Sequence, residues 1–256
     1  MTPIKLFDLS GSVAIITGGN GGIGRSIAIG LAEAGASIAI FGRNEEKNQK
    51  ILSELKKIRN SSMALQVDIA KRSELEPAVK RVEKELGNIT ILVNNAGIIN
   101  LSGGILNETE ENWDAVIETQ LNAVFLLSKL VAKSMAQHNR GKIINIGSMY
   151  SFFGSARVPS YSTAKGAVIQ LTKSMAVELA LYNVQVNAIV PGWFETDMTA
   201  PIKTNQALYD EIMLRTPAGR WGQPKELAGT AVFLASKASD FVTGETIRVD
   251  GGYAIR

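Results

Sequence analysis

Three residues in the middle of the chain carry groups that could exchange a proton with an alcohol or a ketone. Tyr161 and Lys165 lie four residues apart in the run SYSTAKGA, and Ser148 ends the run INIGS thirteen residues before Tyr161. The spacing of four predicts that Tyr161 and Lys165 share one face of a helix. The ammonium group of Lys165 is expected to lower the pKa of Tyr161 toward the working pH, and the Ser148 hydroxyl is expected to hold a substrate oxygen.

A glycine-rich turn near the start of the chain predicts a second site, for a nucleotide. The apolar run 12–17 leads directly into Thr17-Gly18-Gly19-Asn20-Gly21-Gly22-Ile23-Gly24, and a helix is predicted to follow. Glycines allow a tight turn and let the backbone approach a pyrophosphate, which the free N–H groups at a helix N-terminus then bind. The spacing Gly18-x-x-x-Gly22-x-Gly24 differs from the better-known G-x-G-x-x-G, but its place between a strand and a helix favours dinucleotide binding.

These residues must be positioned by an alternation of strands and helices that runs through the chain. Continuous apolar strands separated by helices predict βαβ units and a parallel sheet with helices on both faces. We therefore predict an α/β protein, a single doubly wound Rossmann domain over residues 1–256 with a seven-stranded parallel sheet. The irregular stretch at about 192–222 is predicted to form a lid over the site. Strands are predicted at 12–17, 37–41, 64–67, 89–93, 142–146, 185–189 and 246–249, and helices at 23–34, 45–59, 74–86 and 111–137, the last of them bent or interrupted.

Composition argues against several other classes of protein. The chain has 256 residues, 45% of them hydrophobic, which suits one domain with a sizeable core, and its net charge is +3. It has no cysteine and a single histidine, His138, so neither a disulfide nor a metal site is predicted. Basic residues such as Lys56, Lys57 and Arg59 alternate with glutamates, which predicts solvated helix faces and no nucleic-acid surface. With no leader and no apolar run of membrane-spanning length in view, a cytoplasmic protein without membrane partners is expected.

The chain resembles the short-chain dehydrogenase/reductase family over nearly its whole length. Members of this family are single Rossmann domains that bind NAD or NADP, usually as homotetramers. The resemblance implies reversible hydride transfer between a nicotinamide and a secondary alcohol or ketone of a small-molecule substrate. It rests on the turn at 17–24, on Asn94-Asn95-Ala96-Gly97, on Ser148, Tyr161 and Lys165, and on Pro191-Gly192, Thr196 and Val249-Asp250-Gly251-Gly252.

The resemblance also implies which residues contact the cofactor. Tyr161 and Lys165 are expected at the nicotinamide ribose, in addition to their role in proton transfer. The run 94–97 could also be simply a turn that ends a strand. The other expected contacts are Gly18, Gly22, Ile23 and Gly24 at the pyrophosphate, Asp68 and Ile69 at the adenine, Asn95, Ala96 and Gly97 on the adenosine ribose side, and Ile189, Pro191, Gly192 and Thr196 at the nicotinamide.

The end of the second predicted strand should decide the choice between NAD and NADP. An acidic residue there would bind the ribose 2′-hydroxyl of NAD and repel the 2′-phosphate of NADP. Gly42 holds this position and Arg43 follows, and a guanidinium suits a 2′-phosphate, so NADP(H) is predicted over NAD(H). Asn20, also expected to contact the cofactor, weighs against this, because NADP-preferring relatives often carry a basic residue there. Arg43 could instead be an exposed loop cation.

One catalytic position departs from the family pattern. The family has an asparagine on its long helix, in a pattern like W-D-x-V-x-x-x-N-L-x-x-x-F, and counting from Trp113 or from Phe125 places Gln120 there. Asn122 lies two residues later, about 200° around a helix, and does not fill the position. Gln120 keeps the amide and adds one methylene, so we expect a working but slower proton relay from Lys165 through water.

The substrate is expected between the loop 149–160 and the lid. Tyr150 and Arg157 lie in this loop, and Trp193 follows Pro191-Gly192. Arg157 could bind a carboxylate or be an exposed or subunit-interface arginine, and Trp193 could line the pocket or pack under the lid. The run from Arg157 to Tyr161 looks like that of gluconate and 2-deoxygluconate dehydrogenases, which predicts a sugar acid or a polyol as substrate.

Two other functions stay open at this point. A 3-oxoacyl carrier-protein reductase is close within the same family, and a basic docking patch for an acidic carrier would favour it. A nucleotide-binding scaffold or sensor without turnover would be a different class of protein, because one fold hosts many functions. Only Gln120 favours that class, while Ser148, Tyr161 and Lys165 argue against it.

Overall fold

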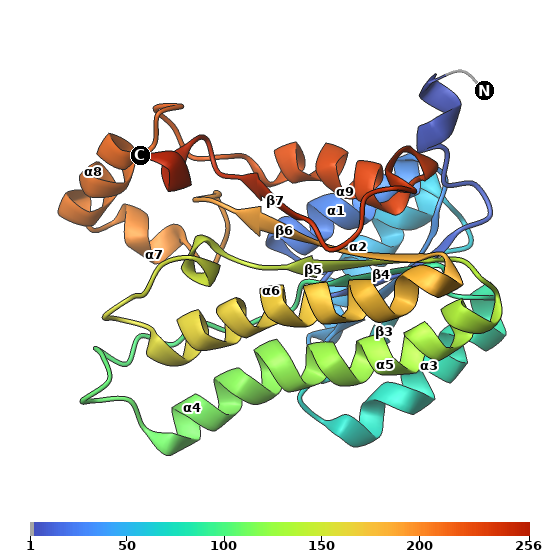
Figure 1. The fold of residues 1–256 in the computed structure, drawn as a ribbon, viewed down its shortest axis with the longest axis horizontal. Helices are drawn as coiled ribbons and strands as arrows, with labels where there is room; N and C mark the ends of the chain where they lie inside the picture. The colour runs from blue at the N-terminus through green and yellow to red at the C-terminus, as the bar shows by residue number, and fades with distance from the viewer. Residues whose placement is uncertain (1–2) are drawn as a thin grey trace.

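The computed structural model describes residues 3–256, which form one seven-stranded sheet with helices on both faces (Figure 1). Every neighbouring pair of strands is parallel, and the strand order is β3-β2-β1-β4-β5-β6-β7. The predicted doubly wound α/β fold is therefore confirmed. The strands are β1 (Val13–Thr17), β2 (Ser37–Gly42), β3 (Met63–Gln66), β4 (Ile91–Asn94), β5 (Gly141–Ile146), β6 (Val184–Pro191) and β7 (Thr246–Val249).

The strands form where the sequence has unbroken apolar runs, because both faces of a parallel sheet are covered. All residues of β1, β4, β5 and β6 are buried, whereas the edge strand β7 is partly exposed. Each predicted strand agrees with the structure to within two residues at either end.

The helices divide into two layers, each packed on its own apolar core. Helices α1, α2 and α9 pack on one face of the sheet, and α3, α5 and α6 pack on the other, as the two sides of the sheet in Figure 1 show. Helix α9 was not among the predicted helices. The helices are α1 (Gly22–Glu33), α2 (Glu45–Ile58), α3 (Arg72–Leu86), α4 (Glu110–Ile117), α5 (Ala123–Gln137), α6 (Pro159–Leu179), α7 (Ala200–Lys203), α8 (Gln206–Arg215) and α9 (Ala228–Ala235).

The long helix predicted at 111–137 is interrupted by a π-helical turn, η2 (Glu118–Asn122), between α4 and α5. Val116, Gln120 and Val124 are all buried and recur every four residues. In an unbroken α-helix, with 3.6 residues per turn, Val124 would be turned about 80° away from Val116. The wider π turn takes up this difference, and such turns are frequent at functional sites.

The same run of helix is long and apolar enough to span a membrane, contrary to the expectation from sequence. However, its buried residues pack against the sheet, with Leu127, Val131 and Met135 in one core. The run is therefore a core helix of the domain, which passes the same test of length and composition.

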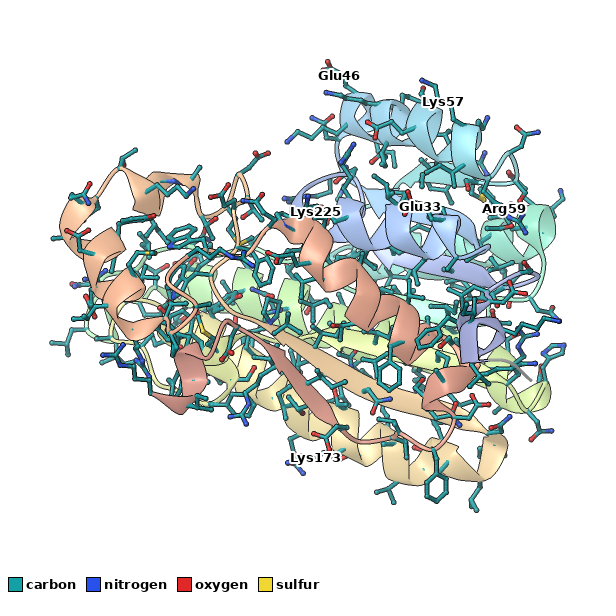
Figure 2. All side chains as sticks on the ribbon, turned by 90° about the horizontal axis from the view of Figure 1, so that it is seen from above. Glu33, Glu46, Lys57, Arg59, Lys173 and Lys225 are labelled. Atoms are coloured by element: carbon teal, nitrogen blue, oxygen red, sulfur yellow. The ribbon has the colours of Figure 1, made fainter. Side chains whose placement is uncertain are left out.

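The basic residues that alternate with glutamates lie on solvated helix faces. Lys56 and Lys57 are exposed on α2, and Figure 2 shows Lys57 and Glu46 projecting from this helix away from the sheet. His138 caps the end of α5, where its ring contacts the Asn88 side chain at the surface.

The irregular segment at 192–222 leaves the sheet after β6 and returns to its starting point. Phe194 pairs with Gly222 in an isolated parallel bridge, and the Gly222 N–H donates to the Trp193 carbonyl over 2.8 Å. Helices α7 and α8 form the loop between these two ends and lie to one side of the sheet (Figure 1). Such a narrow neck suits the predicted lid, which stays a prediction.

Candidate active site

The structure brings Ser148, Tyr161 and Lys165 together at the carboxyl end of β5. Ser148 begins a short 3-10 helix directly after the strand, and Tyr161 and Lys165 lie in the first turns of α6, which Pro159 opens. The Lys165 Nζ lies 5.6 Å from the Tyr161 ring centroid and donates to the Ile146 carbonyl over 2.7 Å. A phenol, an ammonium and a hydroxyl thus meet at the edge where open α/β sheets bind ligands.

The pKa of Tyr161 is shifted upward, opposite to the direction expected from the sequence, and the pKa of Lys165 is shifted as well. Burial raises the pKa of Tyr161 to about 12, although a hydrogen bond with Ser148 opposes the rise. Burial also lowers the pKa of Lys165 to about 8. The prediction that Lys165 lowers the pKa of Tyr161 was wrong here, because desolvation disfavours both charged forms. Near neutral pH Tyr161 is a neutral phenol, ready to donate its proton.

A residue that the sequence analysis missed, Ser151, ties the two segments of this site together. Its Oγ accepts from the Ser148 N–H over 3.2 Å and donates to the Lys165 carbonyl over 2.8 Å. The backbone of Ser148 is thereby held against α6. The two serines form a capping box in the structure, but the usual sequence pattern has Glu or Gln in the place of Ser151, so no clear signal for it was present in the sequence.

Gln120 lies in the π turn, with none of its surface exposed. Its Nε2 donates to the Ile98 carbonyl over 2.5 Å, while its buried Oε1 has no hydrogen-bond partner in the described chain. A Cβ on Gly97 would lie 2.6 Å from this Oε1, so the glycine makes room for the longer amide. Asn122 donates to Glu118 Oε2 over 2.6 Å instead.

The glycine turn takes a backbone shape that only glycines allow at several positions. Gly18 and Gly22 have φ angles of +64° and +50°, which favour glycine. A Cβ on Gly24 would collide with the Gly18 carbonyl and with Asn95 Nδ2. Gly21 caps α1 without any side chain, so the first N–H groups of the helix point to an open N-terminus. These features fit the phosphates of a dinucleotide, and Ile23 lies in the same first turn.

The run 94–97 is joined to the glycine turn through Thr17. The Thr17 Oγ1 accepts from the backbone N–H of Asn95 over 2.9 Å and of Ala96 over 3.0 Å. Asn95 Nδ2 in turn donates to the Thr17 carbonyl over 2.9 Å. The run therefore ends β4 as a turn and is joined to the glycine loop, while its contact with the adenosine ribose stays a prediction.

The end of β2 holds a pair of side-chain amides. Asn20 Nδ2 donates to Asn48 Oδ1 over 2.7 Å, directly beside Gly42, and Arg43 is exposed. Sequence reasoning missed Asn48. A signal was present, because Asn48 shares the buried stripe of α2 with Ile51 and Leu55 and is its only polar member.

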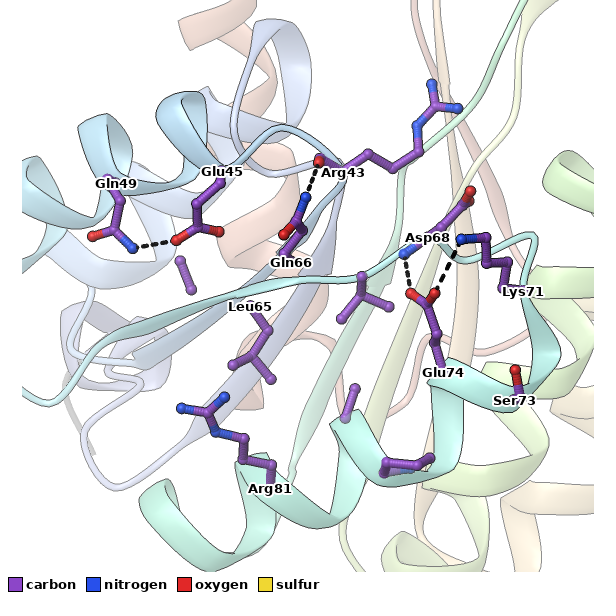
Figure 3. A pocket seen from close by; sticks show the side chains of 14 residues that line it. Arg43, Glu45, Gln49, Leu65, Gln66, Asp68, Lys71, Ser73, Glu74 and Arg81 are labelled. Atoms are coloured by element: carbon purple, nitrogen blue, oxygen red, sulfur yellow. Dashed lines mark hydrogen bonds and ion pairs between the residues drawn. The ribbon is translucent and has the colours of Figure 1, made fainter.

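A cavity of about 980 Å³ opens beside this strand end, between α2 and α3 (Figure 3). Arg43 and Asp68 stand at its rim, where the Asp68 N–H donates to Glu74 Oε2 over 2.8 Å. The Ile69 side chain lies in the core instead of the cavity. Asp68 therefore borders the cavity, whereas Ile69 is not among the residues that line it.

The residues expected at the nicotinamide lie at the carboxyl end of β6. Pro191 ends the strand, and a Cβ on Gly192 would lie only 2.6 Å from the Asp250 Cα that follows β7. The Thr196 methyl lies 3.5 Å from the position of a Cβ on Gly22, so the start of the 192–222 segment approaches the glycine turn. Ile189 is fully buried within β6.

The residues expected on the substrate side lie around Tyr161 and at the neck of the segment. The Tyr150 ring packs edge-on against the Tyr161 ring at 6.1 Å, and burial raises the pKa of Tyr150. Arg157 is exposed, and none of the ion pairs among residues 3–256 involves it. The Trp193 ring lies 5.6 Å from the Trp221 ring, and it also packs against the cluster that contains Met149. Trp193 thus lies at the neck and packs on the small core cluster between β6 and α6.

Comparison with known proteins decides the family. The family model described as enoyl-(acyl carrier protein) reductase matches residues 18–254, and close relatives cover the chain almost end to end. The chain belongs to the short-chain dehydrogenase/reductase family. Within residues 3–256, no three His, Asp or Glu side chains are grouped to hold a metal ion.

Family members with named activities are similar to this chain over its full length. The 2-dehydro-3-deoxy-D-gluconate 5-dehydrogenase of Dickeya dadantii is 43% identical, with 99% of each chain covered. The 5-keto-D-gluconate 5-reductase of Escherichia coli is 42% identical, with 98% of each covered. The structure of a gluconate 5-dehydrogenase from Burkholderia cenocepacia in complex with NADP and tartrate superposes with a TM-score of 0.94, at 41% identity and 99% coverage of both chains.

We expect Gln120→Asn to change the rate of turnover by less than about tenfold, the low end for an element of proton transfer. The Gln120 amide donates to the Ile98 carbonyl and is buried against Gly97. An asparagine at this position would keep an amide there and lack only one methylene group. Steady-state rates of the two forms measure the effect. A gain far above tenfold would mean that Gln120 breaks the proton relay in the natural chain.

Proposed function

We propose that the protein is an NADP(H)-dependent oxidoreductase that interconverts a secondary alcohol and a ketone of a sugar acid. The observation that carries this proposal is the grouping of Ser148, Tyr161 and Lys165 at the carboxyl end of β5, beside the glycine turn. The activities named for the full-length relatives, on gluconate and its keto and deoxy derivatives, support the substrate class.

The roles of the catalytic residues follow from their chemistry. When bound, the nicotinamide cofactor supplies or accepts the hydride. Tyr161 gives its phenolic proton to the substrate oxygen in reduction and takes it back in oxidation, and the Ser148 hydroxyl holds the same oxygen. Lys165, whose pKa is lowered to about 8, keeps most of its charge at pH 7 and lies close enough to stabilise charge on the phenol oxygen.

The cofactor proposal rests on the turn and on the end of β2. Gly18, Gly22 and Gly24 would hold the pyrophosphate of the cofactor, and the Arg43 guanidinium would bind the 2′-phosphate that distinguishes NADP. Gly42 places no acidic side chain there to repel that phosphate. NADP in the complex of the Burkholderia cenocepacia relative supports this choice.

Arg157 is proposed as the residue that recognises the carboxylate of the substrate. It lies exposed in the loop between Ser148 and Tyr161, and its charge reaches the Tyr150 hydroxyl, whose pKa it lowers against the effect of burial. The complex of the Burkholderia cenocepacia relative contains tartrate, a dicarboxylic acid, which supports an acid as the class of ligand. The 192–222 segment would then close over the substrate, with Trp193 at its neck.

A test compares gluconate-type acids with neutral polyols, each with NADP and with NAD, by the formation of reduced cofactor. We expect faster turnover of the acids, and we expect Arg157→Met to raise KM for acids by about tenfold while KM for polyols stays within about twofold. Arg140→Met, at the amino end of β5, is the matched control and should change neither. Equal rates on acids and polyols in the natural chain would remove the role of Arg157.

A 3-oxoacyl carrier-protein reductase is the second candidate, which the carrier-protein name of the matching family model supports. A 3-oxoacyl thioester in the same assay separates the two activities. Tight cofactor binding without turnover of any of these substrates would favour the scaffold. By resemblance to its family, the protein is also proposed to be a homotetramer.

A further inference from the structure

A buried amide on α2, Asn48, lies behind the proposed cofactor site. Its side chain has none of its surface exposed, although it is polar and lies among apolar neighbours. Asn48 Nδ2 donates to the carbonyl of Gly42 over 2.9 Å and to that of Leu65 over 3.3 Å, at the ends of β2 and β3. Both of its N–H groups are therefore used by the sheet.

These two bonds fix which way the Asn48 amide points. Because carbonyls can only accept, the nitrogen of Asn48 must face the strands and its oxygen must face the glycine turn. This oxygen accepts from Asn20 Nδ2 over 2.7 Å, which fixes the amide of Asn20 in turn. One N–H of Asn20 is held by Asn48, and its second N–H and its oxygen stay available to a ligand.

The amide pair also occupies the volume beside Gly42. A Cβ on residue 42 would collide with Asn20 Nδ2 and with Asn48 Oδ1. An acidic side chain at the end of β2 therefore has no room while both amides are in place. Gly42, Asn20 and Asn48 together therefore exclude such a carboxylate.

We propose that Asn48 is a positioning residue for cofactor choice, which acts on a bound dinucleotide through Asn20. It aims the free N–H of Asn20 toward the ribose 2′ position, where a phosphate gains more from a fixed donor than a hydroxyl does. Asn48 itself touches no part of the cofactor. This inference rests on the proposed use of NADP(H).

The test is to measure the dissociation constants of NADPH and NADH separately, by titration of cofactor fluorescence without substrate. The variants are Asn48→Ala, Asn20→Ala and the double variant, and Ser53→Ala is the control. Ser53 is exposed on the same helix, and its hydroxyl donates only to the Gln49 carbonyl, so its loss should change neither constant. Asn48→Ala is expected to raise the dissociation constant of NADPH by about tenfold and that of NADH by less than about threefold. The reason is that a hydrogen bond to the charged 2′-phosphate is stronger than one to the neutral 2′-hydroxyl.

The design separates this inference from the proposed function. A natural protein that binds NADH as tightly as NADPH would overturn the proposed NADP preference. If the natural protein prefers NADPH but Asn48→Ala lowers the affinity for both cofactors by the same factor, Asn48 has only a structural role and the inference fails. Asn20→Ala leaves the bonds of Asn48 to the strands intact, so it tests the pair even if Asn48→Ala does not fold, and an unchanged preference would overturn the inference. In the double variant, the loss of Asn48 should add nothing to the loss of Asn20.

Discussion

Tyr161→Phe is expected to lower kcat by about a thousandfold, while the cofactor still binds within about twofold of its natural affinity. General acid–base groups contribute about 10² to 10⁴ to rates, and the phenolic proton of Tyr161 is the one that the proposed reaction moves. The ring that remains keeps its edge-on contact with Tyr150 and its place near Lys165. The measurement is kcat with the best sugar acid, together with NADPH binding by fluorescence.

Tyr182→Phe provides a matched control for this experiment. Tyr182 lies at the far end of α6, in a short 3-10 helix, and is partly exposed, so the loss of its hydroxyl should leave kcat unchanged. If Tyr161→Phe kept more than about a tenth of the natural kcat, another group would have to move the proton. The phenolic proton that Tyr161 keeps near pH 7 would then not be the one transferred in the reaction.

Lys165→Met is expected to abolish turnover and at the same time to stabilise the protein near pH 7 by about 1 kcal/mol. Lowering a pKa from 10.5 to about 8 corresponds to about 3 kcal/mol of destabilisation of the charged form, and the loss of the charged hydrogen bond to the Ile146 carbonyl offsets about 2 kcal/mol of this. The charged Lys165 ammonium therefore lowers the free energy of unfolding of the natural protein. Urea unfolding of both forms measures the difference in the free energy of unfolding.

The stability gained in Lys165→Met should depend on pH in one direction. The unfolded chain binds the Lys165 proton more tightly than the folded chain, so the cost is fully present below pH 8. As pH rises from 8 to 10.5, the cost disappears, and the variant should lose most of its advantage by pH 10. Lys173→Met, exposed on the same helix and labelled in Figure 2, should show no such change. An advantage that persists at pH 10 would mean that packing, and not desolvation, explains it.

Much of the fold could be predicted because apolar runs and glycine turns act locally. The strands follow from unbroken apolar runs, and the helix that carries Tyr161 and Lys165 follows from their spacing. Helix α9 escaped prediction because its run AGTAVFLA is apolar all round, and a short run of that kind has no period that separates helix from strand.

Features that depend on contacts between distant segments could not be predicted in the same way. The pKa of Tyr161 is set by how deeply the loop after β5 and α6 enclose it, and the local charge of Lys165 pointed in the opposite direction. The Asn20–Asn48 pair joins residues 28 positions apart, which no local pattern links. Grouping of the catalytic residues was foreseeable, whereas the environment that tunes them was not.

The π turn at Glu118–Asn122 contains one residue more than a regular α-helix would need at this place. Each residue of an α-helix turns the chain by about 100°, so after the deletion of one residue Val116 and Val124 would be seven residues apart and would still share a face to within about 20°. Helices α4 and α5 would therefore keep their faces toward the core, whereas the Gln120 amide, which lies within the turn, would no longer be held at the Ile98 carbonyl. A one-residue deletion in this turn should therefore damage catalysis far more than one in the exposed loop around Asn60 would.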